Sequence, residues 1–344
     1  MAVLSQTMLG LADIYKRTEG KQKAAADIIE MMNDTSQDIF DDFVMTECND
    51  GTKHTHTIRT GLPDVGWGQL YKGTAQSKSQ TQQVDDVTGF VEGLSSVDKR
   101  LLDLAGPNRE AIRRSESEPF VEAMAQELVS ALFYHDPATD VKKPKGLSPR
   151  FATLANSGAG NQIVDAGGTG SDNMSIWMVT WGGAGLHGLY PEGTAAGIKQ
   201  EDKGEQRVLD AEGNPYYAEE ELIRAHMGFG LRDYRRVSRI ANIDASDLAA
   251  GSVDLYKFMR KAYYKLQNRR LTKVRKQENA QHTVIYMNTD ALEALDGLAT
   301  NAGSSDNFAR LKTTEIEGKE VMAYRGIPIR EADALVNTEA RVIA

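Results

Sequence analysis

The chain has 344 residues, of which 40% are apolar and 26% are charged, and these values are ordinary for a globular protein with one large domain or a few lobes. No apolar run approaches the roughly 18 residues that a membrane-spanning helix needs, and the first residues lack the charged stretch expected of a secretory signal. The formal net charge of −9 disfavours a general coat for nucleic acid, and with Cys48 as the single cysteine no intrachain disulfide can form.

Residues 1–48 are predicted to be helical or partly helical, and the character of the chain changes after them. Residues 49–93 show no helical period and few apolar side chains. Within this stretch, 54–60 alternates in the manner of a strand and 84–91 can pair back with it. The glycines between the two mark bends. The simplest geometry is a long two-stranded ribbon that projects from the body.

Such a ribbon is marginal alone, because an isolated hairpin buries too little surface to offset the entropy of ordering it. It is therefore either a mobile surface loop or a segment that lies on another molecule. We expect the second, with inter-subunit contacts at six side chains of the ribbon. These are Trp67, Leu70, Tyr71, Lys72, Val84 and Val87.

A long amphipathic helix is predicted over residues 117–134. Ser117 can cap it, and Pro119 suits its first turn. Apolar residues from Val121 to Phe133 then recur at helical spacing, and the pair His135–Asp136 followed by Pro137 ends the helix.

The remainder alternates irregularly between strands and helices. Residues 144–170 are predicted to be loop. A strand is expected at 175–180, with Trp177, Val179 and Trp181 on one face, and a second helix at about 254–277. The other expected elements are a hairpin around 208–215, strands at 236–240, 283–287, 319–324 and 327–330, and a short helix at 289–298. Without βαβ alternation, the fold class is α+β.

Three patterns that could support chemistry are weak. Gly183, Gly185 and Gly188 form a G-x-G-x-x-G sequence, but Pro191 follows where a nucleotide-binding loop must open a helix, so a turn is favoured. His54 and His56 could share a strand face and bind a metal, although a solvated strand face is favoured. Acidic neighbours should raise the pKa of the Cys48 thiol, which disfavours a nucleophile. We therefore expect no catalytic residues, no metal, no cofactor and no enzyme activity.

Basic residues are concentrated on the second predicted helix. The candidate contact face comprises Arg260, Lys261, Arg269, Arg270 and Lys273. It can meet nucleic acid phosphates, or it can be a solvated face or pair with an acidic surface on a neighbouring copy. The acidic balance of the whole chain favours the latter two interpretations.

Several segments resemble the major capsid proteins of tailed double-stranded DNA bacteriophages, in particular a podovirus-like subgroup with the Hong Kong 97-like fold. The resemblance lies in residues 283–288 and 324–330 and in a central block. That block contains Trp177, Trp181–Gly182, 187–191, 201–205 and 239–244. The order of arm, ribbon, long helix, mixed lobe and returning strand is also similar.

The resemblance implies a shell protein that forms hexamers and pentamers around double-stranded DNA, located in the virion after assembly in the host cytoplasm. It implies an N-terminal arm (1–48), an extended loop (49–93), a peripheral domain with a spine helix (94–144), a mainly axial domain (145–301) and a return to the peripheral domain (302–344). A separate scaffolding protein, a portal and a decoration protein are expected partners. The alternatives are a nanocompartment shell and a soluble nucleotide-dependent enzyme built on the Gly183–Gly188 loop.

Overall fold

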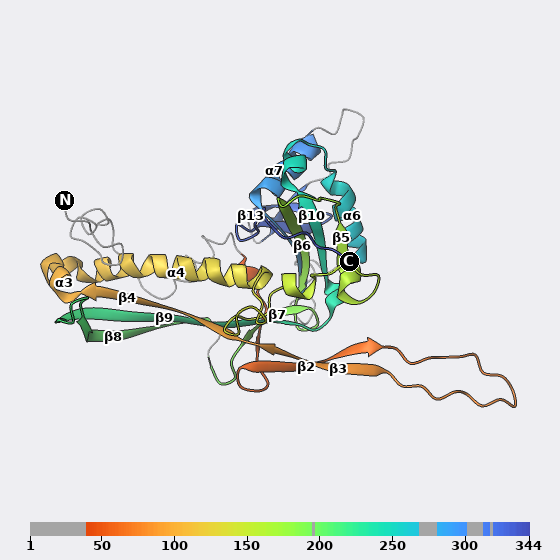
Figure 1. Ribbon diagram of the computed structural model, residues 1–344, viewed down its shortest axis with the longest axis horizontal. Helices are drawn as coiled ribbons and strands as arrows, with labels where there is room; N and C mark the ends of the chain where they lie inside the picture. Colours follow the sequence, from red (N-terminus) through yellow and green to blue (C-terminus); the bar gives the residue numbers. More distant parts are fainter. Residues whose placement is uncertain (1–38, 195–196, 268–280, 301–311, 317–318) are drawn as a thin grey trace.

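The computed structural model describes residues 39–194, 197–267, 281–300, 312–316 and 319–344. They form a long rod, a lobe above one end of the rod, and a ribbon that projects away from both (Figure 1). The predicted N-terminal helix lies mostly outside the described residues. Its last part, from Ile39, contains only a short 3₁₀ turn and strand β1 (Met45–Glu47).

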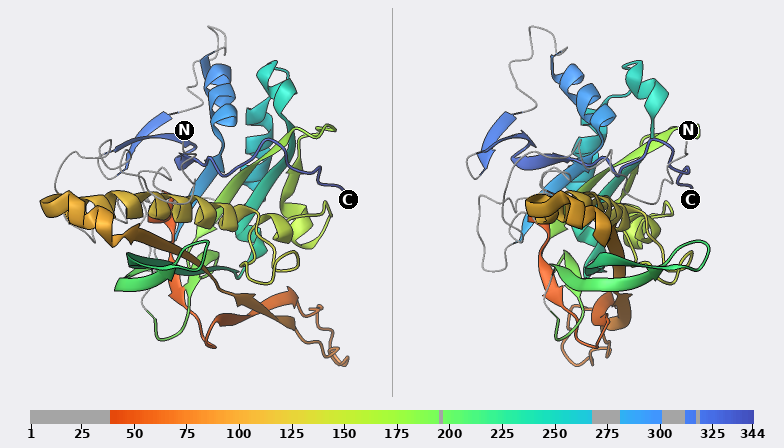
Figure 2. Two further views of the ribbon diagram at one scale, coloured as in Figure 1. Left: turned by 60° about the vertical axis from the view of Figure 1, so that its left-hand side comes forward. Right: turned by 90° about the vertical axis from the view of Figure 1, so that its left-hand side faces the viewer.

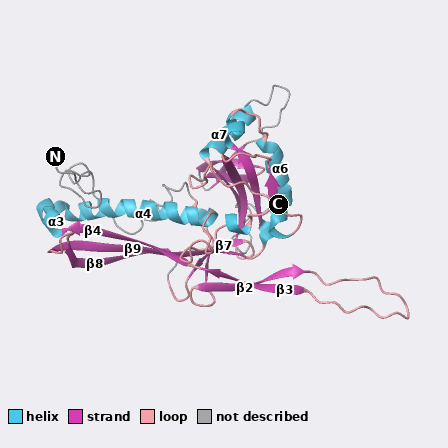
Figure 3. Ribbon diagram, in the orientation of Figure 1, coloured by secondary structure: helices cyan, strands magenta, loops and turns pink. Residues whose placement is uncertain are grey.

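The rod is helix α4 (Arg109–Phe133) laid along a three-stranded antiparallel sheet (Figure 3). The strands are β4 (Gly89–Asp98), β9 (Pro215–Leu231) and β8 (Gly197–Leu209), in that order. With 25 residues, the helix is about 37 Å long. It lies close to the sheet because β4 carries Gly93, where a Cβ would approach the ring of Phe120 to 2.9 Å.

The predicted start of this helix at Ser117 is wrong. Helix α4 begins at Arg109, and the Ser117 hydroxyl donates to the carbonyl of Arg114 instead of capping a helix end. Pro119 lies inside the helix. The first two turns are held by Ile112, which packs with Val97 of β4 and Leu102 of helix α3 (Lys99–Ala105).

The lobe is built on a mixed sheet (Figure 2). Each face of this sheet carries an apolar core. Its strands are β5 (Ile163–Asp165), β10 (Val237–Asp244), β6 (Asn173–Trp181), β11 (His282–Met287), β14 (Ile327–Glu331), β13 (Lys319–Tyr324) and β12 (Lys312–Ile316). β7 (Leu186–Tyr190) joins this sheet to β9. Trp177, Val179 and Trp181 share the face that packs towards α4, as predicted.

The other face of the lobe sheet is covered by helices. They are α5 (Ala245–Ala249), α6 (Leu255–Lys265) and α7 (Thr289–Thr300). Helix α6 is capped by Asp254, whose side chain accepts from the amide of Lys257. It is shorter than predicted, because Leu266 is extended and ends it. The predicted continuation to 277 lies largely outside the described residues.

Buried ion pairs fasten both ends of the described chain into the lobe. Near one end, Asp42 is fully buried and accepts from Arg330 Nε at 3.3 Å and from the Tyr286 hydroxyl at 3.2 Å. Near the other, Glu339 binds Arg239 Nη2 at 2.8 Å and the Tyr134 hydroxyl at 2.6 Å. A buried charge is tolerated only when it is paired and hydrogen-bonded, so these contacts specify where each end lies.

Candidate functional site

The ribbon predicted from the sequence is present as strands β2 (Lys53–Gly61) and β3 (Gln80–Val87), which pair antiparallel. It ends at Val87 instead of continuing to Val91, because Gly89 begins β4 and pairs with β9. A Cβ at Gly89 would lie 2.7 Å from the carbonyl oxygen of Lys142, so the chain passes too close to the body to remain in the ribbon.

The connection between the two strands, residues 62–79, is irregular and fully exposed. Two hydrogen bonds join residues within it, from the Lys72 amide to the Gln69 carbonyl and from the Ser77 hydroxyl to the Asp64 carbonyl. We name this segment the ribbon tip. It extends well beyond the rest of the molecule (Figure 1).

The ribbon tip carries large apolar side chains that nothing in the described chain covers. Trp67 and Tyr71 are each 104% exposed, and Leu70 is 87% exposed. Leu62 and Val65 are similarly exposed, Lys72 is exposed, Val87 is half exposed and Val84 is half-buried. A soluble protein rarely leaves so many large apolar groups together in water, so the tip has the character of a contact surface.

The base of the ribbon is held by a buried ion pair that the sequence analysis missed. Asp86 is 2% exposed and accepts from Arg150 Nη2 at 2.7 Å and from the Leu231 amide at 3.3 Å. Arg150 also donates to the carbonyl of Phe229 at 2.8 Å. The acidic pair in β3 held a signal for this, because Asp85 and Asp86 must point to opposite faces of a strand and one of them must therefore face the body.

His54 and His56 share a face of β2 as predicted, but that face is not solvated. His56 is buried, and its Nε2 donates to the Leu231 carbonyl at 2.9 Å. The His54 ring lies edge-on to His187 of β7 at 5.6 Å between centroids. Burial lowers the pKa of His54, and it lowers the pKa of His187 to about 4. His187 is therefore neutral at pH 7.

Acidification should weaken the fold through His187. The pKa of His187 is about 4 in the folded protein and 6.5 for an unperturbed histidine, as in the unfolded chain. The contribution of the neutral ring to stability is therefore complete above pH 6.5 and is lost as the pH falls towards 4. We expect the free energy of unfolding of the wild type to fall by roughly 3 kcal/mol more over this range than that of His187→Gln. Urea denaturation at a series of pH values measures both slopes, and parallel slopes would contradict the assignment.

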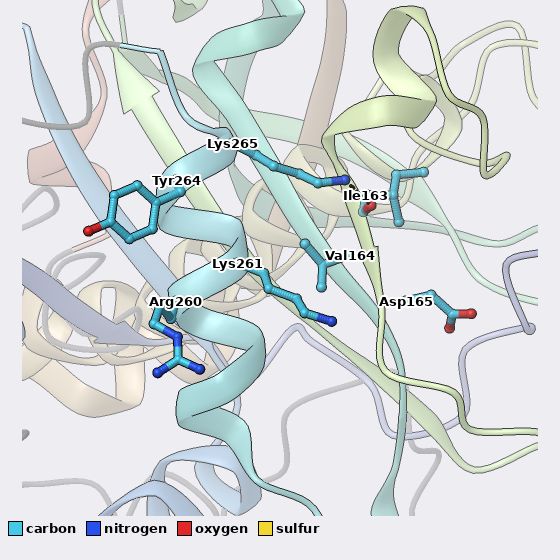
Figure 4. A pocket seen from close by; sticks show the side chains of 7 residues that line it. All are labelled: Ile163, Val164, Asp165, Arg260, Lys261, Tyr264 and Lys265. Atoms are coloured by element: carbon cyan, nitrogen blue, oxygen red, sulfur yellow. Dashed lines mark hydrogen bonds between the residues drawn. The ribbon is translucent and has the colours of Figure 1, made fainter.

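The candidate basic face lies on α6, beside strand β5 (Figure 4). Arg260, Lys261 and Lys265 line an open hollow of about 620 Å³ together with Tyr264 and residues 163–165. Lys265 Nζ donates to the carbonyls of Asn161 and Ile163, whereas Arg260 and Lys261 are exposed. The other predicted members of the face, Arg269, Arg270 and Lys273, lie outside the described residues.

The glycine sequence at 183–188 makes a strand connection, as favoured above. It joins β6 to β7, and no helix follows. A Cβ at Gly185 would lie 2.3 Å from the carbonyl oxygen of Thr180, so this glycine permits a close backbone approach. The nucleotide-binding alternative is wrong, since the loop opens no helix whose amides could hold a phosphate.

Three further features concern Cys48, metal ligands and membrane spans. Cys48 is buried, and this burial raises the pKa of its thiol. The negative charges of Glu192 and Glu47 raise the same pKa to a smaller extent. Among the residues the structure covers, no group of three or more His, Cys, Asp or Glu is arranged to hold a metal ion. Within the same residues, no helix combines the length and apolarity needed to span a membrane.

Residues 20–343 match the family of the major capsid protein GP7. The chain belongs to this family of capsid proteins. It is a structural protein of the virion capsid and not an enzyme, and the resemblance to phage capsid proteins with the Hong Kong 97-like fold is confirmed. The family favours the phage capsid over the nanocompartment alternative.

One solved structure supports the assignment over the whole length. A chain from the near-atomic cryo-electron microscopy structure of bacteriophage Epsilon15 is 30% identical to this capsid protein, covers 100% of both chains and has a TM-score of 0.72. The bacteriophage JBD30 capsid is a more remote match, with 8% identity, coverage of 85% of this chain and 88% of that chain, and a TM-score of 0.43. No curated protein sequence matches significantly.

Proposed function

We propose that this capsid protein assembles as hexamers and pentamers into an icosahedral shell around phage double-stranded DNA, and that each copy uses its ribbon to hold a neighbour. The observation that carries this proposal is the exposure of Trp67, Leu70 and Tyr71 at the end of a ribbon that leaves the body. In a single copy no surface covers these side chains, and in the shell a neighbouring copy would cover them. Lys72, Val84 and Val87 complete the proposed inter-subunit contacts.

The arrangement suits head-to-tail association. The ribbon tip and the surface that receives it are different parts of the chain, so the contact is heterologous and repeats around a ring until the ring closes. Each contact can be weak, because a closed shell multiplies many of them. The buried ion pair between Asp86 and Arg150 fixes the base of the ribbon on the body. This limits the orientations of the ribbon and lowers the entropy lost when its tip binds a neighbour.

The proposed domain division remains 1–48, 49–93, 94–144, 145–301 and 302–344. Within it, the rod corresponds to the spine helix of the peripheral domain, and most of the lobe corresponds to the axial domain. Strands β8 and β9 lie beside α4, although they belong to the segment proposed as mainly axial. Separate scaffolding, portal and decoration proteins remain predictions that follow from the resemblance.

A photo-activated cross-linker tests where the ribbon lies. We expect p-benzoylphenylalanine in place of Gln69, an exposed position in the ribbon tip, to cross-link neighbouring copies on irradiation of assembled shells. Irradiation of dissociated copies should give no cross-link between copies. The same group at Gln206 on β8 serves as a comparison position. Shells seen by electron microscopy in which only intra-chain products form at Gln69 would contradict the proposed role of the ribbon.

A further inference from the structure

Helices α6 and α7 lie side by side on one face of the lobe sheet and carry opposite charge. Their apolar sides share one core, and the Tyr256 hydroxyl of α6 donates to the Leu295 carbonyl of α7 at 3.3 Å. α6 contains four basic residues and no acidic one, whereas α7 contains three acidic residues and no basic one. Apart from Lys265, which is half-buried, these charged side chains are exposed.

The basic face of α6 has no ion-pair partner among the described residues. Lys257, Arg260 and Lys261 are exposed, and none of them forms an ion pair with a residue that the structure describes. Asp165 is the single carboxylate among the residues lining the neighbouring hollow, and it already accepts from the Gly167 amide and from Asn242 Nδ2. Like charges three and four residues apart on a helix repel one another, so this face gains from an anionic partner.

The acidic face of α7 offers carboxylates of the right number and spacing. Asp290, Glu293 and Asp296 recur every three residues and are all exposed. The positive end of the helix dipole favours Asp290 in the first turn, and Asp290 also accepts from Asn337 Nδ2. Together the three carboxylates make the outward side of α7 acidic.

The two faces occupy different parts of the lobe. α6 packs over β10 and β5, and β5 is an edge of the sheet, so the basic face borders that edge. α7 follows β11, which lies further into the sheet, and it contacts α5. One chain therefore presents both surfaces at separate places. When the basic face of one copy joins the acidic face of the next, each copy still has one unoccupied face for a further copy.

We propose that the α6 basic face of one copy docks on the α7 acidic face of the adjacent copy within each ring of the shell. This inference rests on the proposed assembly into rings and names the surfaces that would join the lobes. Its occupant is a second copy of this chain, chosen for charge complementarity. The contact would add specificity and orientation to rings that the ribbons already hold, because complementary charge favours the correct neighbour and opposes wrong ones.

Charge reversal across the contact tests the proposal. The basic-face variant carries Arg260→Glu and Lys261→Glu, and the acidic-face variant carries Glu293→Lys and Asp296→Lys. We expect each to lower the yield of assembled particles by roughly tenfold or more under conditions where the wild type assembles, because like charges then face each other at every contact. Circular dichroism and thermal melting of the unassembled protein check that each variant is folded, and Glu293→Lys alone provides a milder acidic-face change.

Two rescue experiments separate this contact from a general charge effect. The charge-swapped variant with all four substitutions should recover assembly, because every contact is again complementary. An equimolar mixture of the basic-face and acidic-face variants should also assemble, but only in rings with an even number of copies, since each variant can follow only the other. Electron microscopy of the mixture should therefore show hexamers without pentamers.

Each outcome has a distinct meaning. Failure of the wild type to form shells, with or without a scaffolding protein, would sink the proposed function itself. Normal shells from both single-face variants would overturn only the inference about α6 and α7. Normal shells from the basic-face variant combined with weakened binding of double-stranded DNA would also overturn it, because the basic face would then serve nucleic acid.

Discussion

A chain in which the ribbon tip is replaced by Asn-Gly is expected to fold like the full-length protein and to form no shells. Gly61 and Gln80 already face each other in the ribbon, so a two-residue hairpin turn can join β2 to β3. The tip makes two internal hydrogen bonds and buries no large side chain. Its loss should therefore change the free energy of unfolding by no more than about 1 kcal/mol.

The effect of this deletion on assembly should be large, because the tip would bury its apolar side chains only against a neighbouring copy. Fully burying a large apolar side chain contributes about 1.5–3 kcal/mol. The tip offers five such side chains, Leu62, Val65, Trp67, Leu70 and Tyr71. Every copy loses this contribution at once. Thermal denaturation of the unassembled protein measures the first part of the prediction, and electron microscopy with sedimentation measures the second.

Point substitutions refine this test. The pair Trp67→Ser and Tyr71→Ser should abolish shells, while Thr74→Ala and Gln76→Ala, at exposed polar positions of the same segment, should leave them intact. Shells of normal yield from the deletion would refute the ribbon's role. A broader deletion of residues 70–86 is unsuitable, because it also removes Asp86 and with it the buried root of the ribbon.

Asp86→Ala should cause a large loss of stability. The change leaves the Arg150 guanidinium buried without its carboxylate, and breaking a buried ion pair from one side costs about 3–5 kcal/mol. The Leu231 amide loses an acceptor as well. Urea denaturation measures the loss, and limited proteolysis should show new cleavage in β2 and β3 as the ribbon detaches from the body.

Two comparison variants sharpen the interpretation. The double change Asp86→Ala with Arg150→Met should lose less stability than Asp86→Ala alone, because no charge is then left buried without a partner. Glu201→Ala removes the exposed pair with Lys203 and should leave the free energy of unfolding nearly unchanged. Equal losses for Asp86→Ala and Glu201→Ala would show that the ribbon root is not a buried pair of the kind described.

Local pattern predicted the elements better than it predicted their limits. The ribbon, the strand at Trp177 and the start of α6 follow from alternation, polarity and helical spacing, which neighbouring residues determine. The start of α4 was misplaced because Ser117 and Pro119 carry the usual marks of a helix beginning. What overrides those marks is the packing of Ile112 on β4 and α3, a contact between distant segments.

The sequence could indicate that Asp85 or Asp86 faces the body, but it could not identify the partners at the ribbon root, for the same reason. Asp86 and Arg150 are 64 residues apart, and His56 meets a carbonyl 175 residues away. Alternation places His54 and His56 on one face but cannot say what covers it. That face was predicted to be solvated, and it is buried because β7 and β9 return beneath it.

The buried ion pairs of Asp42 and Glu339 affect how the protein responds to mechanical force. A shell packed with nucleic acid is stretched from within, and tension reaches each protomer through the segments that extend furthest from its core. Because the carboxylates near both ends of the described chain pair with arginines of the same sheet, tension applied at either end passes into the lobe sheet through these two pairs.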